Sequence, residues 1–351
     1  MKIGITLRGV AAAAAVSLTL VASGCGGGGE SGGTEASPGA AGSEAAENAN
    51  LAITFVPKNL GNPYFDTSDK GGEEAISEFG GKYAEVGPAE ASPDAQVSYI
   101  NTLTQQQVGG IVISANDKKA IGDALQEARD AGIKVVTYDS DTEPEYRDLF
   151  VNQATAEGIA KVQIDMIAEQ IGDSGEIAIL SASANATNQN AWIELMKKEL
   201  ANHPNIKLVD TVYGNDKDQE SFDKTAALLQ SHPNLKGIIA PTTVGIAAAG
   251  RYLSTSKAKG KVALTGLGTP NQMRKYVQDG TVKEFALWNP HDLGYLAAYA
   301  TKSLITGEIK GTEGDKFTAG KLGEYTVGAD NTVVLGDPYK FNKDNIDQFK
   351  F

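Results

Sequence analysis

One uncharged stretch, Ser181–Trp192, is rich in side chains that form hydrogen bonds. It reads Ser-Ala-Ser-Ala-Asn-Ala-Thr-Asn-Gln-Asn-Ala-Trp and so combines amides and hydroxyls with one indole. Amide groups both donate and accept, which suits a neutral polyhydroxylated ligand better than a phosphate or a metal ion. We therefore expect this stretch to contact a neutral polyol through Asn188, Gln189 and Trp192.

The residues around this stretch indicate which elements position it. The apolar run Glu176–Leu180 predicts a buried strand before it, and the pattern of Ile193–Leu200 predicts a helix after it. A loop from a parallel strand to a helix lies at the carboxyl edge of the sheet, where open α/β proteins bind ligands. Strand and helix patterns alternate from Leu51 onward, which favours an α/β fold with parallel sheets.

The strand patterns fall into two groups, each of a plausible domain size. We expect strands at 51–56, 83–86, 110–114, 134–138, 177–180, 206–213, 237–240, 261–266 and 284–288. Ser92-Pro93-Asp94 and Asn116-Asp117 are typical of helix starts. The pattern weakens from Gly311, with short strands expected at 323–327 and 332–335.

Polar residues follow nearly every predicted strand, so both sheets would carry them on their carboxyl edges. If the two edges face each other, they line one cleft. The residues that we expect to bind the ligand are Lys58, Asn59, Asn62, Tyr64, Phe65, Asn116, Asp139, Asn188, Gln189, Trp192, Pro241, Thr243, Trp288 and Asn289. The aromatic residues among them offer flat surfaces for the C–H face of a sugar ring, and the polar ones suit sugar hydroxyls, which donate once and accept twice.

Several of these residues also have a purely structural interpretation. Phe65 and Trp192 could be core aromatic residues at helix starts, and Asp139 could be only a cap or turn residue. Lys58 could be a solvated surface charge. Asn188 could cap the following helix, a role that is compatible with ligand contact.

Composition and motifs argue against other classes of protein. The formal charge is −13 and there is no basic patch, which argues against nucleic-acid binding. His203, His232 and His291 lack metal-ligand spacing, and hydrolase, nucleotide-binding and zinc-protease motifs are missing. The loop Gly266-Leu-Gly268 lacks the third glycine of a dinucleotide site. We therefore expect no enzyme activity, cofactor or metal; a carbohydrate-active enzyme is the alternative from another class.

The N-terminus has the pattern of a secretory signal peptide over residues 1–25. Lys2 and Arg8 precede the apolar run Val10–Ala22, which is too short to span a membrane comfortably. Ala22-Ser-Gly-Cys25 resembles a bacterial lipobox, with Ala22 where Leu is more usual, which implies lipidation of Cys25. A plain signal peptide with a stray cysteine is the alternative. Residues 26–50 have the composition of a flexible tether.

From Leu51 to Phe351 the chain resembles the type I periplasmic sugar-binding proteins of ABC importers, within them the rhamnose-binding proteins and the autoinducer-2 receptors. The segments that carry the resemblance are 57–65, 138–141, 186–192, 239–245 and 285–290. It implies two Rossmann-like lobes joined by three crossovers, a membrane permease as partner, and a monomer. We divide the chain into an N-lobe, residues 51–153 plus 290–322, and a C-lobe, residues 154–289 plus 323–351.

The two kinds of relative differ at positions that concern the ligand. Autoinducer-2 receptors have a Lys and an Asp that match Lys58 and Asp139, then an Asp-Gln pair where this chain has Asn188-Gln189. They also have Ala where this chain has Thr243, after a Pro that matches Pro241. Because the charged acceptor is lost, we expect rhamnose or a similar deoxyhexose as ligand, with autoinducer-2 as the alternative.

Overall fold

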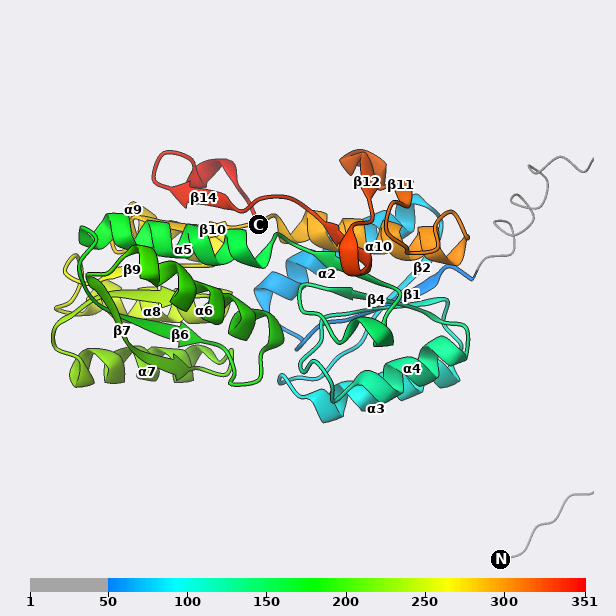
Figure 1. Cartoon of the computed structure of the whole chain (residues 1–351), viewed down its shortest axis with the longest axis horizontal. Helices are drawn as coiled ribbons and strands as arrows, with labels where there is room; N and C mark the ends of the chain where they lie inside the picture. The colour runs from blue at the N-terminus through cyan, green and yellow to red at the C-terminus, as the bar shows by residue number, and fades with distance from the viewer. Residues whose placement is uncertain (1–49) are drawn as a thin grey trace, which may run out of the picture. The chain divides into compact units, whose positions relative to one another are not determined.

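The computed structural model describes residues 50–351, which form two α/β lobes built on parallel sheets (Figure 1). The predicted fold class, two Rossmann-like lobes, is therefore confirmed. The predicted signal peptide, Cys25 and nearly all of the predicted tether lie outside the described residues. Within residues 50–351, no helix combines the length and the apolar character needed to cross a membrane.

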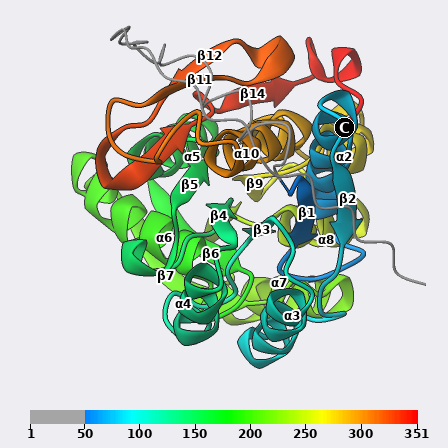
Figure 2. The ribbon, with the colours of Figure 1, turned by 90° about the vertical axis from the view of Figure 1, so that its right-hand side faces the viewer.

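The first lobe is built on a six-stranded parallel sheet of order β13-β5-β4-β3-β1-β2. Its strands are β1 (Ala52–Val56), β2 (Lys82–Glu85), β3 (Gly110–Ile113), β4 (Lys134–Tyr138), β5 (Leu149–Asn152) and β13 (Thr332–Val334). Helices α3 (Pro93–Gln105) and α4 (Gly122–Asp130) lie on one side of this sheet, and α2 (Pro63–Glu78) and α10 (Pro290–Ile305) on the other (Figure 1 and Figure 2). The sheet is therefore covered on both faces, which explains its nearly continuous apolar strands.

The second lobe repeats this plan with a sheet of order β7-β6-β8-β9. Its strands are β6 (Gly175–Ser181), β7 (Ile206–Tyr213), β8 (Leu235–Ala240) and β9 (Ala263–Gly266), with β10 (Glu284–Leu287) beside β9 through a parallel bridge from Leu267 to Ala286. Strand β14 (Tyr339–Asn342) pairs antiparallel with β10. Helices α5 (Ala156–Ile171) and α6 (Thr187–Glu199) pack together, and α8 (Thr243–Thr255) packs between α7 (Asp218–Ser231) and α9 (Pro270–Gln278).

Both sheets reverse their strand order at an equivalent place. In the first lobe β1 lies between β2 and β3, and in the second lobe β6 lies between β7 and β8. Ligands of open α/β sheets bind outside the carboxyl ends of the strands at such a switch point. Lys58 follows β1, the stretch 182–189 follows β6, and Pro241 follows β8. The topology therefore puts the predicted ligand residues at the two switch points.

Close packing of α2 against α10 fixes two of these loops. A Cβ atom at Gly71 would lie 1.9 Å from the carbonyl oxygen of His291, and one at Gly294 would lie 1.8 Å from that of Ser68. Only glycine permits so close an approach of two backbones. Helix α2 begins next to Asn62 and α10 next to Asn289, so this contact holds the segments that lead into both helices.

The C-terminal segment differs from the sequence-based division. We assigned residues 323–351 to the C-lobe, which is wrong for Thr332–Val334, because they pair with Phe150–Asn152 in the first sheet. Strand β11 (Lys316–Thr318) and β12 (Glu324–Thr326) form a separate hairpin. The chain thus returns to the second lobe only between β13 and β14. A strand as short as β13 fits either sheet by its pattern, and its partner β5 was not predicted.

Candidate functional site

A cavity lies between the lobes, at the carboxyl edges of both sheets. The residues that line it are Lys58, Asn62, Tyr64, Phe65, Asp139, Asn188, Gln189, Trp192, Asp216, Pro241, Thr242, Thr243, Leu267, Leu287 and Trp288. All but three of the residues that the sequence suggested are among them.

A contact among Lys58, Asp139 and Asn188 connects the two lobes. The Lys58 ammonium donates to the Asn188 Oδ1 at 3.0 Å and lies 3.8 Å from the Asp139 carboxylate. The Asn188 amide nitrogen donates back to the carbonyl oxygen of Asp139 at 3.3 Å and to its carboxylate at 3.4 Å. Lys58 is only 6% exposed, so it is not the solvated surface charge that the sequence left open. A neutral amide of one lobe thus meets an ion pair of the other.

Asp139 is held in place by groups of its own lobe. Its carboxylate accepts hydrogen bonds from the Tyr64 hydroxyl at 3.0 Å and the Ser114 hydroxyl at 2.9 Å. Its φ of 60° is in the left-handed region, which few residues other than glycine adopt and Asp tolerates. Burial raises the pKa of Asp139, and the Lys58 ammonium and the hydroxyl donors oppose that rise. Asp139 is therefore a turn residue and also a fixed acceptor that faces the cavity.

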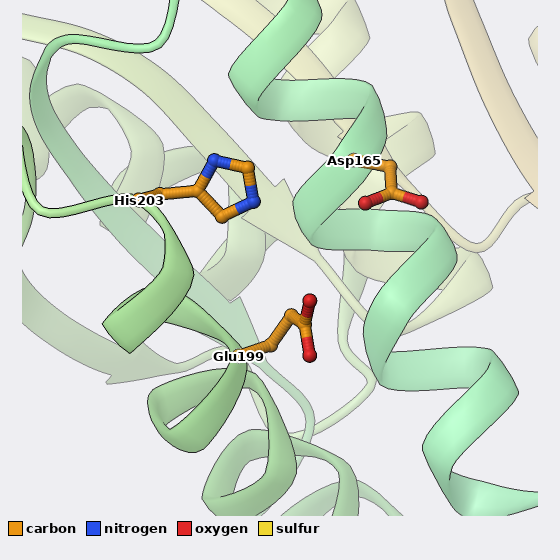
Figure 3. Close-up of side chains that lie close together, drawn as sticks. All are labelled: Asp165, Glu199 and His203. Carbon is orange, nitrogen blue, oxygen red and sulfur yellow. The ribbon is translucent and has the colours of Figure 1, made fainter.

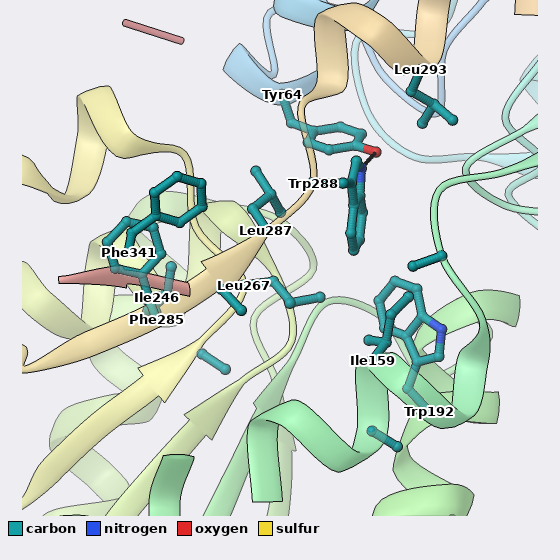
Figure 4. Packing of buried hydrophobic residues seen from close by; sticks show 14 of the residues in the cluster. Tyr64, Ile159, Trp192, Ile246, Leu267, Phe285, Leu287, Trp288, Leu293 and Phe341 are labelled. Carbon is teal, nitrogen blue, oxygen red and sulfur yellow. Dashed lines mark hydrogen bonds between the residues drawn. The ribbon is translucent and has the colours of Figure 1, made fainter. Parts of the chain in front are cut away.

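Aromatic rings form the wall beside this acceptor. The Trp288 indole donates to the Tyr64 hydroxyl at 2.8 Å, and the two rings meet edge to face (Figure 4). Trp192 packs edge to face on Trp288 (Figure 4). Phe65 and Trp192 belong to the hydrophobic core and also line the cavity, so both interpretations of these residues hold. The wall offers rigid apolar surface with few free rotamers.

The loop before α6 is fixed by Gln189. Its Oε1 accepts from the Ser181 hydroxyl at 2.7 Å and from the backbone N–H of Ala182 at 2.8 Å. Helix α6 begins at Thr187 with Ala186 at the N-cap position, so Asn188 is not the helix cap. Its amide is instead directed across the cleft. The amide-rich stretch therefore divides into Gln189, which shapes the loop, and Asn188, which reaches the other lobe.

Three predicted residues lie outside the cavity wall. Asn116 donates from its amide to the backbone carbonyl of Lys58 at 2.9 Å, which fixes the loop that presents the lysine. Asn289 caps α10 by accepting from the N–H of His291 at 3.1 Å. The Asn59 Oδ1 is buried and has no partner among the described residues. Asn116 and Asn289 thus support the site from behind.

Two polar residues of the wall, Asp216 and Thr242, were not among the predicted ligand residues; the sequence placed Thr242 at the carboxyl edge of a strand, whereas Asp216 was not singled out. Asp216 follows β7 in the turn Gly214-Asn215-Asp216, and the Thr242 hydroxyl donates to its Oδ1 at 2.5 Å. Burial raises the pKa of Asp216, the Thr242 hydroxyl and the Lys58 ammonium oppose that rise, and Asp139 adds to it. The rule that found the other residues, a polar side chain after a strand, also applies to 206–213 and would have found Asp216.

The described residues also hold one cluster of a histidine with carboxylates, Asp165, Glu199 and His203 (Figure 3). Lys161 neutralises part of its charge, because its ammonium binds both oxygens of Asp165 at 2.9 Å and lies 4.0 Å from Glu199. His203 Nδ1 lies 2.6 Å from Asp173. Ion pairs therefore account for this cluster, and we assign it no ligand.

Comparison with known proteins identifies relatives along most of the chain. Residues 53–309 match the family described as periplasmic binding protein domain. A sugar ABC transporter structure from Actinomyces odontolyticus is 54% identical, with a TM-score of 0.71 over 86% of this chain and 99% of that one. A solute-binding protein from Clostridium phytofermentas, solved with bound L-rhamnose, is 40% identical, with a TM-score of 0.83 over 86% and 98% of the two chains. LsrB from Clostridium saccharobutylicum, solved with AI-2, is 27% identical, with a TM-score of 0.80 over 85% and 99%.

Proposed function

Because the chain belongs to the periplasmic binding protein family and is a sugar-binding protein of an ABC importer, we propose that it captures L-rhamnose or a similar neutral deoxyhexose. The observation that carries this proposal is the interlobe contact of Asn188 with Lys58 and Asp139. A hydroxyl group both donates and accepts, so sugar hydroxyls can replace the amide in this contact.

The choice of sugar rests on the neutral character of the second lobe at this point. The relative with bound L-rhamnose is 40% identical to this chain, against 27% for the relative with AI-2. An aspartate at position 188 would place a third carboxylate beside Asp139 and Asp216. Asn188 avoids that repulsion and leaves Lys58 and Asp139 available to the hydroxyls of an uncharged ligand.

Closure of the lobes would signal that the sugar is bound. A ligand that contacts both walls binds the closed form more tightly than the open form and so shifts the population toward closure. The permease of the importer would then recognise the closed pair of lobes.

The protein is also proposed to be a lipoprotein that acts outside the cytoplasm, where its family works. The apolar run Val10–Ala22 followed by Cys25 supports lipidation of that cysteine. Residues up to about 50 would then tether the lobes to the outer face of the membrane. The test is to replace Cys25→Ser and follow the protein by fractionation; the variant should leave the membrane fraction. Retention of the variant in that fraction would contradict lipidation.

We further propose that the sugar leaves chemically unchanged. The two carboxyls in the wall, Asp139 and Asp216, are each held by hydroxyl donors of the protein. Incubation with L-rhamnose and related sugars, followed by chromatography, should return every sugar intact. Turnover of any of them would favour the alternative of an extracellular carbohydrate-active enzyme.

Thermal shift with a panel of neutral sugars tests the proposed ligand class. L-rhamnose should raise the melting temperature more than sugars that differ in configuration or carry a carboxylate. If no neutral sugar raises the melting temperature, the proposal is wrong. A second candidate, an autoinducer-2 receptor, is favoured by the lysine and aspartate at 58 and 139. Release of reporter-active ligand from denatured protein would support that candidate.

A further inference from the structure

A second cavity lies next to the first and partly opens to solvent. It shares three wall residues with the first cavity, Asp139, Asn188 and Trp192. Its other walls include Gln153, which lies between β5 and α5, and Thr187, the first residue of α6. Like the first cavity, it is thus lined by residues of both lobes.

Gln153 has hydrogen-bonding groups that no described residue satisfies. The side chain is 1% exposed, yet neither its amide nitrogen nor its amide oxygen has a partner. The Thr187 hydroxyl, in the same wall, is likewise buried without a partner. A buried polar group without a hydrogen bond is costly, so a native structure that keeps three such atoms at one cavity needs a reason for them.

The partition between the cavities is the side chain of Asn188. Its amide nitrogen reaches Asp139 by contacts of 3.3 and 3.4 Å, both longer than the usual 2.7–3.2 Å of an N–H···O bond. Such long bonds are weak. The Asn188 Oδ1 also accepts from the Lys58 ammonium at 3.0 Å and from the N–H of Gln189 at 2.9 Å, so a ligand that displaces the side chain must replace these two bonds. A ligand that displaces this amide gains access to both cavities.

The walls of the second cavity suit a neutral polar ligand. Arg147 binds the Asp141 carboxylate with two parallel bonds of 2.7 and 2.8 Å, so these two charges neutralise each other. The Arg147 guanidinium also lies 5.6 Å from the ring centre of Phe150. Asp139 and Lys118 in the same walls are paired with Lys58 and Glu143, and Asp330 also lines the cavity. The uncharged groups of the walls include the Gln153 amide, the Thr187 hydroxyl and the Trp192 ring.

From these observations we propose that the second cavity binds a second sugar unit, so that the full ligand is a neutral disaccharide that spans both cavities. Gln153 and Thr187 would take hydroxyls of the second unit, and the ring of Trp192, common to both walls, would contact both units. This inference rests on the proposed function, since it assigns a monosaccharide unit to the first cavity.

Calorimetry with L-rhamnose and with rhamnosyl-rhamnose disaccharides of different linkages tests this inference. At least one disaccharide should bind the full chain tenfold or more tightly than L-rhamnose, with one site per protein. Gln153→Ala should reduce that disaccharide affinity about tenfold and change the affinity for L-rhamnose less than twofold. Thr187→Val, which removes only the hydroxyl, should reduce disaccharide affinity several-fold and serves if the Gln153 variant fails to fold.

Gln170→Ala is the matched control, because Gln170 also has a buried unpartnered amide nitrogen but lines a different cavity. It should leave both affinities unchanged. Binding of L-rhamnose without tighter binding of any disaccharide would overturn the inference and leave the proposed function intact. Equal loss of both ligands in the Gln153 and Thr187 variants would also overturn it, since it would indicate a structural role. No heat with either sugar would refute the proposed function itself.

Discussion

The two walls of the interlobe cavity differ in how charge is arranged. The first lobe contributes an ion pair, Lys58 and Asp139, whose carboxylate accepts from Tyr64 and Ser114. The second lobe faces it mainly with neutral groups, of which Asn188 bonds to Lys58 and Asp139 and Trp288 bonds to Tyr64 across the cleft. The first wall is therefore an anchor that is built before the ligand arrives.

We therefore expect the two walls to have different roles, one in affinity and the other in the choice of ligand. Groups held by several hydrogen bonds cost little reorganisation when a ligand binds, so the first wall supplies most of the affinity for hydroxyl groups. Side chains of the second wall are held by fewer hydrogen bonds, so they can be substituted without loss of the hydrophobic core. We therefore expect affinity to depend most on Asp139, and the choice between neutral and differently shaped ligands to depend on Asn188 and Thr243.

The largest effect is expected from removal of the anchor. Asp139→Ala should weaken L-rhamnose binding by about 1.5–3 kcal/mol, the range for hydrogen bonds to charged groups, which is roughly tenfold to 150-fold. Calorimetry measures the change. Asp165→Ala, which removes a carboxylate on the outer face of α5, is the control and should bind normally. Unchanged affinity in Asp139→Ala would remove this residue from the site.

A negative charge at position 188 should remove part of the difference in charge between the two walls. Asn188→Asp turns the amide donor that faces Asp139 into a third carboxylate of the cavity wall, so we expect about tenfold weaker L-rhamnose binding, or roughly 1.4 kcal/mol. The ratio of autoinducer-2 to L-rhamnose affinity should rise. Asn190→Asp is the matched control, because Asn190 is on the same helix but bonds back to Ala184. If the ratio stays the same in Asn188→Asp, position 188 does not select the ligand.

A smaller effect is expected at Thr243, where the helix α8 begins. Thr243→Ala removes a hydroxyl and a methyl from the second wall but keeps a good helix former. Loss of one neutral hydrogen bond should lower the affinity for L-rhamnose about two- to fivefold, near the lower end of 0.5–1.5 kcal/mol. An effect as large as that of Asp139→Ala would mean that the walls are energetically equal.

The smallest effect concerns stability and pH, at Asp216. Burial raises the pKa of this carboxyl in the folded protein, so its contribution to stability is full below the unfolded value, about 3.9, and is lost as pH rises through the folded value. Asp216→Asn has no proton to lose. The melting temperature of wild type minus that of the variant should therefore fall as pH rises from about 4 to 7. A difference that is constant with pH would show that Asp216 keeps an ordinary pKa.

Much of the site followed from the sequence because one rule, polar residues after parallel strands, holds in both lobes. That rule placed Lys58, Asp139 and Asn188 at one cleft, and the structure brings their side chains within bonding distance. The rule could not distinguish residues that face the cavity from residues that hold its loops in place from behind. Asn116 and Asn289 follow strands as well, yet their amides bond to backbone groups behind the wall. Such a distinction depends on side-chain direction, which the pattern does not contain.

Strands and helices with strong apolar patterns could be predicted from the sequence. Short strands were harder to predict, because the strand with which each one pairs determines the sheet to which it belongs. Strand β5 was missed, and β13, which pairs with it, was given to the wrong lobe. The helix expected after Asn116-Asp117 begins only at Gly122, because Asp117 instead accepts from the N–H groups of Lys119 and Ala120 in a turn. The pairing of β5 with β13 depends on residues far apart in the chain, whereas the start of α4 depends on a local turn that the helix-start pattern did not distinguish.

Calorimetric titration of the wild-type protein with L-rhamnose tests the central claim most directly. The account predicts a saturable heat with one site per chain, and an at least tenfold weaker affinity when Asp139 is replaced by Ala. A titration without heat, or one in which both proteins bind equally, would contradict it.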